Sequence, residues 1–200
     1  MTAAVTRKGE RRRDALVSAA AELLCERGFD AVRHRAVARR AGMPLASTTY
    51  YFSSLDDLIA KAVEHVGEQE AEQLRMRLAG LSRRRRGVES TADVLVDLLL
   101  GDCPTAQISE WLISRYERYV VCARQPALRA IQRRIRQQRA DAVVEAVERS
   151  GRSVQTDRVT ALVCAVDGAV VAALVDDGNS ARASARATLV DVIDALAPFG

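Results

Sequence analysis

Residues 33–52 read RHRAVARRAGMPLASTTYYF and hold the strongest structural signal in the chain. Apolar residues recur at helical spacing over residues 33–40, which predicts a short helix there. Gly42 supplies the backbone freedom of a sharp turn, and Pro44 suits the first turn of the next helix because its missing N–H costs nothing there. Phe52 is expected to anchor the segment in the core. A helix, a short turn with glycine and a second helix form a helix-turn-helix, whose second helix lies in the major groove of DNA.

The second helix of this segment has side chains suited to contact with DNA. Leu45, Ala46 and Ser47 are small or slim, so the helix can approach base edges, and Ser47 can exchange a hydrogen bond there. Tyr50 and Tyr51 each present a hydroxyl on a stiff ring, a group that commonly bonds phosphate oxygens. The residues predicted to contact DNA are Arg33, Arg35, Pro44, Leu45, Ala46, Ser47, Thr49, Tyr50 and Tyr51.

The same segment resembles the DNA-binding headpiece of the TetR family of bacterial repressors. The residues that carry the resemblance are Ala41-Gly42-Met43, the aromatic cluster Tyr50-Tyr51-Phe52, the acidic helix start Ser53-Ser54-Leu55-Asp56-Asp57 and, further back, Gly28-Phe29. The similarity covers roughly the first 60 residues. It implies a dimer whose headpieces bind double-stranded operator DNA and whose helical bodies bind a small-molecule effector.

Three positions depart from the family pattern. Thr49 stands where the family usually has a tyrosine, Leu55 where it has a phosphate-binding lysine, and Arg33 where a serine or threonine caps the first helix of the motif. These changes leave the fold in place but alter individual contacts, among them the phosphate contact of the lysine that Leu55 replaces. Fewer phosphate contacts imply that DNA binding depends less steeply on salt than is usual in the family.

The composition indicates an all-α protein with a sizeable core. Of the 200 residues, 48% are hydrophobic and 4% aromatic, and alternating β-branched runs are scarce. The sequence contains no nucleophile elbow, glycine-rich phosphate loop, metal-ligand spacing or paired carboxylates with a histidine, so we expect no enzyme, metal site or cofactor. Cys25, Cys103, Cys122 and Cys164 stand far apart without a CxxC pair, as thiols of a reducing cytoplasm do.

Positive charge is concentrated in the first quarter of the chain. The net charge is +4, and residues 1–50 contain ten Lys or Arg against five Asp or Glu, which gives +5 there and leaves −1 for the rest. This distribution is typical of a DNA-binding protein, although basic N-termini are common elsewhere. Residues 1–8 are expected to form a solvated basic arm, and the alternative is additional phosphate contact through Arg7 and Lys8.

The chain is expected to divide into a DNA-binding domain, residues 1–54, and a helical regulatory and dimerisation domain, residues 55–200. In the first domain, a helix over residues 10–27 with a buried stripe supports the helix-turn-helix and completes a three-helix headpiece. In the second domain, helices are predicted over residues 55–81, 88–100, 105–123, 126–150, 157–176 and 181–197. Ser54 or Asp56 is expected to cap the first of these.

Two groups of arginine fall in the second domain. The run Ser82-Arg83-Arg84-Arg85-Arg86-Gly87 has the composition of a nucleic-acid patch. The long helix before it places the run tens of ångströms from the recognition helix, which favours a solvated loop instead. The second group, Arg133, Arg134, Arg136 and Arg139, is interpreted as the solvent face of its helix.

The last two predicted helices are expected to form a dimer interface. The first of them is apolar or small nearly all round, so it must be covered on every side. Pairing with their twins about a two-fold axis would make a four-helix interface, whereas the alternative is that both helices complete the core of a monomer. The predicted interface residues are Val163, Val166, Val170, Val190 and Ile193. Asp167, within the apolar helix, could meet an arginine, line a pocket or face the partner.

Trp111, Tyr116 and Tyr119 make residues 105–123 the most aromatic part of the predicted body. They are either core residues or the lining of the small-molecule pocket that the family resemblance implies. The predicted function is a cytoplasmic, dimeric repressor released from a palindromic operator by an unknown effector. The alternatives are an activator and a nucleoid-type DNA-binding protein that needs no ligand. The longest apolar stretch, residues 159–175, contains an aspartate and is too short to span a membrane.

Overall fold

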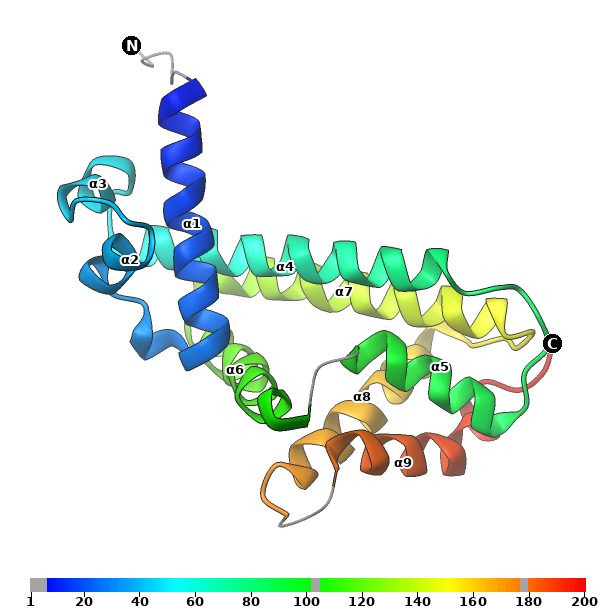
Figure 1. Ribbon diagram of the computed structural model, residues 1–200. Helices are drawn as coiled ribbons and strands as arrows, with labels where there is room; N and C mark the ends of the chain where they lie inside the picture. Colours follow the sequence, from blue (N-terminus) through cyan, green and yellow to red (C-terminus); the bar gives the residue numbers. More distant parts are fainter. Residues whose placement is uncertain (1–6, 102–104, 177–179) are drawn as a thin grey trace. The chain divides into compact units, whose positions relative to one another are not determined.

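The computed structural model describes residues 7–101, 105–176 and 180–200, most of which form helices (Figure 1). In chain order the helices are α1 (Arg7–Arg27), the short 3₁₀ helix η1 (Phe29–Ala31), α2 (His34–Arg40), α3 (Ala46–Tyr51), α4 (Leu55–Ala79), α5 (Val88–Leu100), α6 (Thr105–Arg124), α7 (Pro126–Arg149), α8 (Thr156–Ala173) and α9 (Ala181–Leu196). The predicted all-α fold is confirmed. The predicted N-terminal arm, except for its last residues, and parts of two predicted turns lie outside the described residues.

The chain forms two compact units, and the first contains the helix-turn-helix. This unit comprises Met1–Gln69 and Gln107–Arg133. Its helix α1 packs against η1 and α2, and α2 packs against α3. The buried face of α1 begins at Leu16 and repeats every three or four residues, as the sequence predicts. Gly28 ends α1 with a positive φ of 73°, and its N–H donates to the carbonyl of Leu24.

A serine fixes the start of α4. The hydroxyl of Ser54 accepts the N–H of Asp57 at 3.0 Å, and the Asp57 carboxylate accepts the backbone N–H of Ser53 at 3.2 Å. The first bond satisfies one of the free N–H groups at the helix start, and the second ties the residue before the cap to the first turn, so Ser54 rather than Asp56 is the cap. The compact units divide within α4, between Gln69 and Glu70. The functional boundary at residues 54 and 55 therefore stays a prediction.

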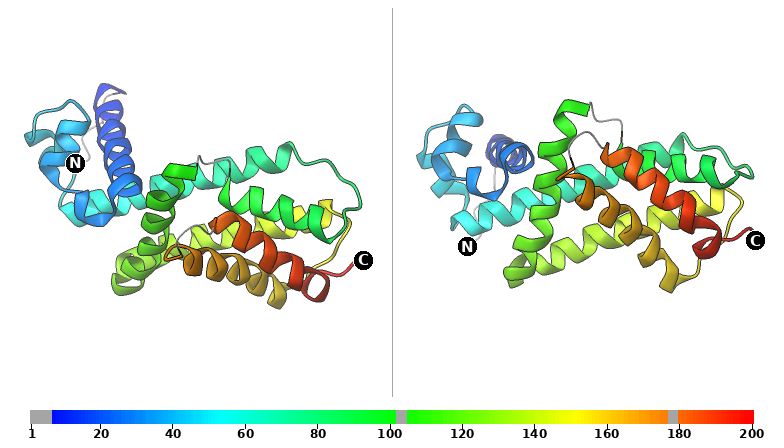
Figure 2. Two further views of the ribbon diagram at one scale, coloured as in Figure 1. Left: turned by 60° about the horizontal axis from the view of Figure 1, so that its bottom comes forward. Right: turned by 90° about the horizontal axis from the view of Figure 1, so that it is seen from below.

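The second compact unit comprises Glu70–Ala106 and Arg134–Gly200. In it α9 packs against both α5 and α8, and Figure 2 shows α8 and α9 side by side. Leu95 and Leu99 of α5, Leu162 of α8 and Leu189 of α9 are almost completely buried and form its core. Burial of such apolar side chains is the main favourable term in the folding of the unit.

Guanidinium groups in the second unit bind the carbonyl groups left free at helix ends. The last carbonyls of a helix lack an intrahelical partner and carry partial negative charge, which an arginine satisfies well. At the end of α4, the guanidinium of Arg149 donates to the carbonyls of Leu78 (2.6 Å) and Leu81 (2.9 Å). Arg77 donates to the carbonyl of Leu98 in α5 (3.0 Å), and Arg86 donates to that of Arg149 in α7 (3.1 Å). Arg152 donates to the carbonyl of Ala197, which follows α9 (2.9 Å). Arginine is thus a structural residue in this unit.

Two predictions about solvent-exposed arginines are wrong in part. Arg86, in the predicted solvated loop, is only 5% exposed, because its guanidinium turns inward to the carbonyls of Ser82 and Arg149. Arg139, assigned to a solvent face, is 1% exposed and forms a two-bonded ion pair with Asp167 at 2.9 and 3.2 Å. Among the alternatives for Asp167, the structure therefore supports the pairing with an arginine.

The predicted dimer residues on α8 and α9 also need correction. Val166, Val170 and Ile193 are 0% exposed and Val163 is 6% exposed, because α8 and α9 pack on each other within the same chain. These four side chains belong to the core of the unit and present little or no surface to a partner chain. Val190 is half-buried. The exposed face of α8 holds other residues, namely Thr160, Ala161, Cys164, Gly168, Val171 and Ala172.

Candidate DNA-binding site

A tight, hydrogen-bonded turn holds the two helices of the helix-turn-helix together. Gly42 follows α2 with a φ of +65°, which residues with a side chain rarely adopt. Its N–H donates to the carbonyl of Arg39 at 3.2 Å, and the N–H of Met43 donates to that of Ala38 at 2.9 Å. These two bonds form a Schellman motif, which satisfies carbonyls at the end of α2 and turns the chain toward α3.

One buried side chain anchors α3 in the headpiece. Thr48 is 0% exposed, and its hydroxyl donates to the carbonyl of Leu45 at 2.8 Å. The hydrogen bond is local to α3, and burial of the Thr48 side chain is what leaves the other side of the helix facing outward. Leu45 is 48% exposed and Tyr50 is 82% exposed, and Ala46 and Thr49 are also exposed. Most of the short helix is therefore free to contact another molecule.

The three aromatic residues at the end of α3 have different environments. Phe52 is 3% exposed, as predicted for a core residue, and the guanidinium of Arg13 lies 5.3 Å from the centre of its ring. Tyr51 is half-buried and meets Tyr50 edge-on, with ring centroids 4.9 Å apart. Because Tyr51 supports one side of its ring, Tyr50 projects into solvent as a stiff arm with a hydroxyl at its end.

An ion-pair network fastens α2 to α1. The guanidinium of Arg40 binds both oxygens of Glu26, at 2.9 and 2.7 Å, and one oxygen of Glu22 at 3.1 Å. The hydrogen bond from Arg40 holds the pKa of Glu26 below its usual value, and the same bonds raise the pKa of Arg40. Arg40 is therefore a positioning residue that fixes the angle of α2 in the headpiece.

The two arginines predicted to contact DNA differ in their surroundings. Arg33 binds locally: its guanidinium donates to the carbonyls of Val32 and Phe29 and pairs with Asp30 at 3.0 Å. It also precedes α2 without capping it through its side chain. Arg35 is exposed on α2. Both remain candidates for phosphate contact, and Arg35 would give up fewer bonds within the protein.

The structure places all nine predicted residues in the helix-turn-helix segment and gives two further residues a role there. Thr48 carries no sequence signal for its buried position, because threonine is usually a surface residue. Arg40 contributes to the basic charge of the headpiece, but its structural role also has a local signal. Glu22 and Glu26 lie four residues apart and so on one face of α1, where a single arginine can reach both.

The three aromatic residues proposed for a pocket lie on α6, in the first unit. Trp111 is half-buried beneath the guanidinium of Arg115, 4.7 Å from its ring centre. Tyr116 and Tyr119 are half-buried and stack with centroids 6.3 Å apart. Being neither fully buried nor fully exposed, they are compatible with both alternatives, a core edge and a pocket wall.

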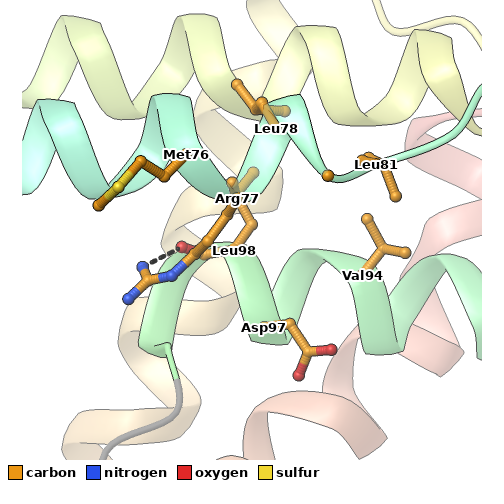
Figure 3. A pocket seen from close by; sticks show the side chains of 8 residues that line it. Met76, Arg77, Leu78, Leu81, Val94, Asp97 and Leu98 are labelled. Atoms are coloured by element: carbon orange, nitrogen blue, oxygen red, sulfur yellow. Dashed lines mark hydrogen bonds between the residues drawn. The ribbon is translucent and has the colours of Figure 1, made fainter.

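A separate groove lies in the second unit, between the end of α4 and α5. It encloses about 300 Å³, and Figure 3 shows its lining. Leu78, Leu81, Val94 and Leu98 give it an apolar floor, and Met76, Arg77, Gly80 and Asp97 complete it. The guanidinium of Arg77 crosses the groove to reach the carbonyl of Leu98. The groove is open to solvent, and its one positively charged side chain, Arg77, is already bound to the carbonyl of Leu98. It therefore offers a ligand fewer specific contacts than the exposed face of α3.

The described residues show no group of His, Cys, Asp and Glu that could hold a metal ion. In the described part of the chain, no helix is both long and apolar enough to cross a membrane. In the described part of the chain, Cys25, Cys122 and Cys164 form no disulfide bond. Cys122 is 1% exposed, and burial raises the pKa of its thiol to about 11, which makes it a poor nucleophile near neutral pH.

Comparison with known proteins adds several relatives. HTH-type transcriptional regulator PksA of Bacillus subtilis (strain 168) is 32% identical over 66 residues, which are 33% of this chain and 32% of that protein. The match thus spans about a third of this relative. Multidrug binding protein EbrR complexed with proflavin is 27% identical, with a TM-score of 0.67 over 91% of this chain and 99% of that chain. The TetR family member SCO1917 from Streptomyces coelicolor A3 is 29% identical, with a TM-score of 0.62 over 90% and 97% of the two chains.

Two family models also match. The model of bacterial regulatory proteins of the tetR family matches residues 16–62, which include the helix-turn-helix. The model of the tetracyclin repressor-like C-terminal domain matches residues 86–195, more than half of the chain. With the geometry of α2 and α3, these matches show that the chain belongs to the TetR family of DNA-binding transcriptional regulators, which are not enzymes.

Proposed function

We propose that this protein is a homodimeric repressor that binds a palindromic operator through α3 and leaves it when a small molecule binds its helical body. The observation that carries the proposal is the exposed face of α3. Tyr50, at 82% exposure, presents a large aromatic ring to solvent on a helix that is otherwise held rigidly by Thr48 and the turn at Gly42. A large side chain held in solvent on a rigid helix is well placed to contact another molecule.

Different side chains of α3 contact the bases and the phosphates. Ala46, Ser47 and Thr49 are small enough to let the helix approach base edges, where they contact a thymine methyl or exchange one hydrogen bond. Tyr50 and Tyr51 bind phosphate oxygens and so set the register of the headpiece on the duplex. The remaining proposed contacts come from Arg33, Arg35, Pro44 and Leu45.

The dimer forms through the exposed face of α8. This face carries Ala161, Cys164, Gly168 and Val171 at helical spacing, and Val171 is 45% exposed. Such small residues let α8 of a second chain approach closely. The sequence also predicts that α8 lies in the dimer interface, but through Val163, Val166 and Val170 on the other side of the helix. A two-fold dimer places two α3 helices in successive major grooves, about 34 Å apart.

The proposed effector that releases the operator is a small molecule bound by the helical body. EbrR is described as a multidrug binding protein and has been solved with proflavin and with ethidium. By analogy, the effector of this protein binds near the aromatic residues of α6, Trp111, Tyr116 and Tyr119. Binding would favour a state of the dimer in which the two α3 helices no longer match the spacing of the half-sites.

Selection of tight-binding duplexes from a random pool tests this function. We expect a palindrome with two half-sites. Tyr50→Phe, which removes one hydroxyl, should then weaken binding to that palindrome several-fold at fixed salt and leave the dimer intact. With no effector present, Tyr119→Phe is the matched control, since it removes the same group from α6 and leaves α3 unchanged.

Each outcome separates the proposal from its alternatives. Binding without an enriched palindrome would overturn sequence-specific recognition and favour a nucleoid-type protein. An enriched palindrome whose binding to the protein raises transcription would indicate an activator. Equal affinities of the Tyr50→Phe and Tyr119→Phe variants would remove Tyr50 from the phosphate contacts but leave the rest of α3 in place.

A further inference from the structure

We propose that the first two turns of α1 form a second DNA contact, which binds backbone phosphates of the duplex that α3 occupies. The contact consists of Arg7, Lys8, Arg11 and Arg12, which we call the basic N-terminal surface. The proposal rests on the proposed function, because it assumes that α3 binds duplex DNA. It goes further because it assigns to α1 phosphate contacts that increase the affinity for DNA beyond that of the helix-turn-helix alone.

The basic N-terminal surface lies on a part of α1 that does not pack in the core. The helix begins at Arg7, but its first buried residue is Leu16, nine positions later. At 1.5 Å per residue, about 14 Å of helix precedes this residue, and Arg13, near the end of that length, already lies over Phe52. Figure 1 shows these first turns projecting past α2 and α3. A projecting helix of this length adds little to the stability of the fold and is free to reach another molecule.

The four cations lie in two pairs separated by one turn of helix. Arg7 stands four residues before Arg11, and Lys8 four residues before Arg12, so each pair shares a face. All four side chains are exposed, and none of them takes part in an ion pair within the described part of the chain. The acidic residues nearby, Glu10 and Asp14, are exposed on the same helix, whereas Arg13 turns toward Phe52.

This arrangement is unfavourable for α1 by itself. Like charges four residues apart repel each other along the helix, and positive charge at the N-terminal end opposes the helix dipole. Helix stability therefore does not account for the four cations. A row of phosphates beside the helix would offset both the repulsion between the cations and their unfavourable interaction with the helix dipole, because each phosphate carries a negative charge.

The basic N-terminal surface is connected rigidly to the recognition helix. α1 packs against α2, the ion pairs of Arg40 fasten the same two helices, and the turn at Gly42 joins α2 to α3. When α3 enters the major groove, α1 is therefore held at a fixed place along the duplex. Phosphates carry no sequence information, so this contact adds affinity and salt dependence but no base preference.

The experiment measures how DNA binding depends on salt. Fluorescence anisotropy gives the affinity of the full chain for the tightest selected duplex, and for a scrambled duplex of the same length, over a series of KCl concentrations. The slope of log K against log salt is negative. In R7Q/R11Q, its magnitude should fall by about 0.9 for each phosphate that the variant no longer neutralises, and by the same amount on both duplexes.

Two further variants control this measurement. R83Q/R84Q removes two exposed positive charges from a loop of the second unit, so its slope should equal that of the wild type. R7K/R11K keeps the positive charges on α1 and should keep the wild-type slope. If R7Q/R11Q has the same slope as R83Q/R84Q, or if R7K/R11K reduces the slope as much as R7Q/R11Q, the pairing of these charges with phosphate is overturned.

The two duplexes separate this inference from the proposed function. A wild-type protein that binds both duplexes equally would contradict sequence-specific recognition by α3, yet a smaller slope for R7Q/R11Q would still support the contact made by α1. A wild-type protein that prefers the selected duplex, with no change of slope in R7Q/R11Q, would contradict only the inference about α1. Absence of binding to either duplex would overturn both.

Discussion

Three arginines of the second compact unit lie in an environment that no arginine of the headpiece has. Between residues 7 and 40, every arginine is exposed or half-buried, and Arg40 meets its carboxylate partners at the surface. In the second unit, Arg86, Arg139 and Arg152 are at most 5% exposed and bind carbonyl or carboxylate oxygens. One residue type therefore supplies surface charge in the first region and internal hydrogen bonds in the second.

The difference follows from what a guanidinium needs when it leaves water. A buried cation is costly unless its donors are used, and the planar fork of arginine offers five donors to oxygens at helix ends. An exposed guanidinium keeps its hydration, and its charge adds to the field that attracts phosphate. The comparison predicts that substitution of a buried arginine weakens folding, whereas substitution of an exposed one in the headpiece weakens DNA binding.

The largest effect on stability is expected at Arg139. Arg139→Met leaves the carboxylate of Asp167 inside the second unit without the two bonds that it now receives. Loss of one partner of a buried pair should lower the free energy of unfolding by about 3 kcal/mol. Urea denaturation followed by circular dichroism measures the change.

The neighbouring Arg136 provides the control for this substitution. It lies on the same helix but is exposed, so Arg136→Met should change the free energy of unfolding by no more than about 0.5 kcal/mol. The double variant R139M/D167L removes both charges and should recover much of the stability that Arg139→Met removes. Equal unfolding midpoints for Arg139→Met and Arg136→Met would show that the buried pair contributes nothing to folding.

A smaller effect is expected at Arg86, within the arginine-rich loop. Arg86→Ala removes the bonds to the carbonyls of Ser82 and Arg149, which should cost about 2 kcal/mol of unfolding free energy. Arg83→Ala, three residues earlier, removes an exposed side chain and should be nearly neutral. Thermal unfolding of the two variants measures the difference. Similar melting temperatures would mean that the whole run is solvated, as its composition suggests.

The sequence was sufficient for the fold because its signals are local. Helical spacing of apolar residues and the glycines at positions 28 and 42 are enough to predict where the helices of the headpiece begin and end. Exposure of α3 also follows from its position after the turn. The nine residues proposed to contact DNA lie together for that reason, although which of them touch bases stays a prediction.

The buried arginines and the exposed face of α8 could not be found in this way. Arg139 and Asp167 stand 28 residues apart, so no helical spacing relates them. On α8, apolar or small residues occur all round, and periodicity then cannot tell the face that packs on α9 from the face left open. From the sequence alone, Val166 and Cys164 could each lie on the face that packs on α9 or on the exposed face, and only the position of α9 in the structure distinguishes them.

The smallest effect is expected at the exposed pair of the headpiece, Glu26 with Arg40. The hydrogen bond from Arg40 lowers the pKa of Glu26, so the pair stabilises the fold above the ordinary glutamate pKa of 4.5. Its contribution is lost as the pH falls through the lowered pKa of the folded state, where Glu26 becomes protonated. Melting temperatures of the wild type and Glu26→Gln should therefore differ slightly at neutral pH and converge in acid.

Exposure to solvent limits how much the pair of Arg40 and Glu26 stabilises the fold, and this distinguishes it from the buried pair of Arg139 and Asp167. The side chains of Arg40 and Glu26 are 32% and 51% exposed, so water and salt screen their attraction, and added salt should shrink the difference between wild type and Glu26→Gln. Glu10→Gln, on the same helix, is the control for the loss of an exposed glutamate. If salt instead left the Glu26→Gln difference unchanged, the pair at Arg40 would behave like the buried pair at Arg139, and exposure would not distinguish the two regions.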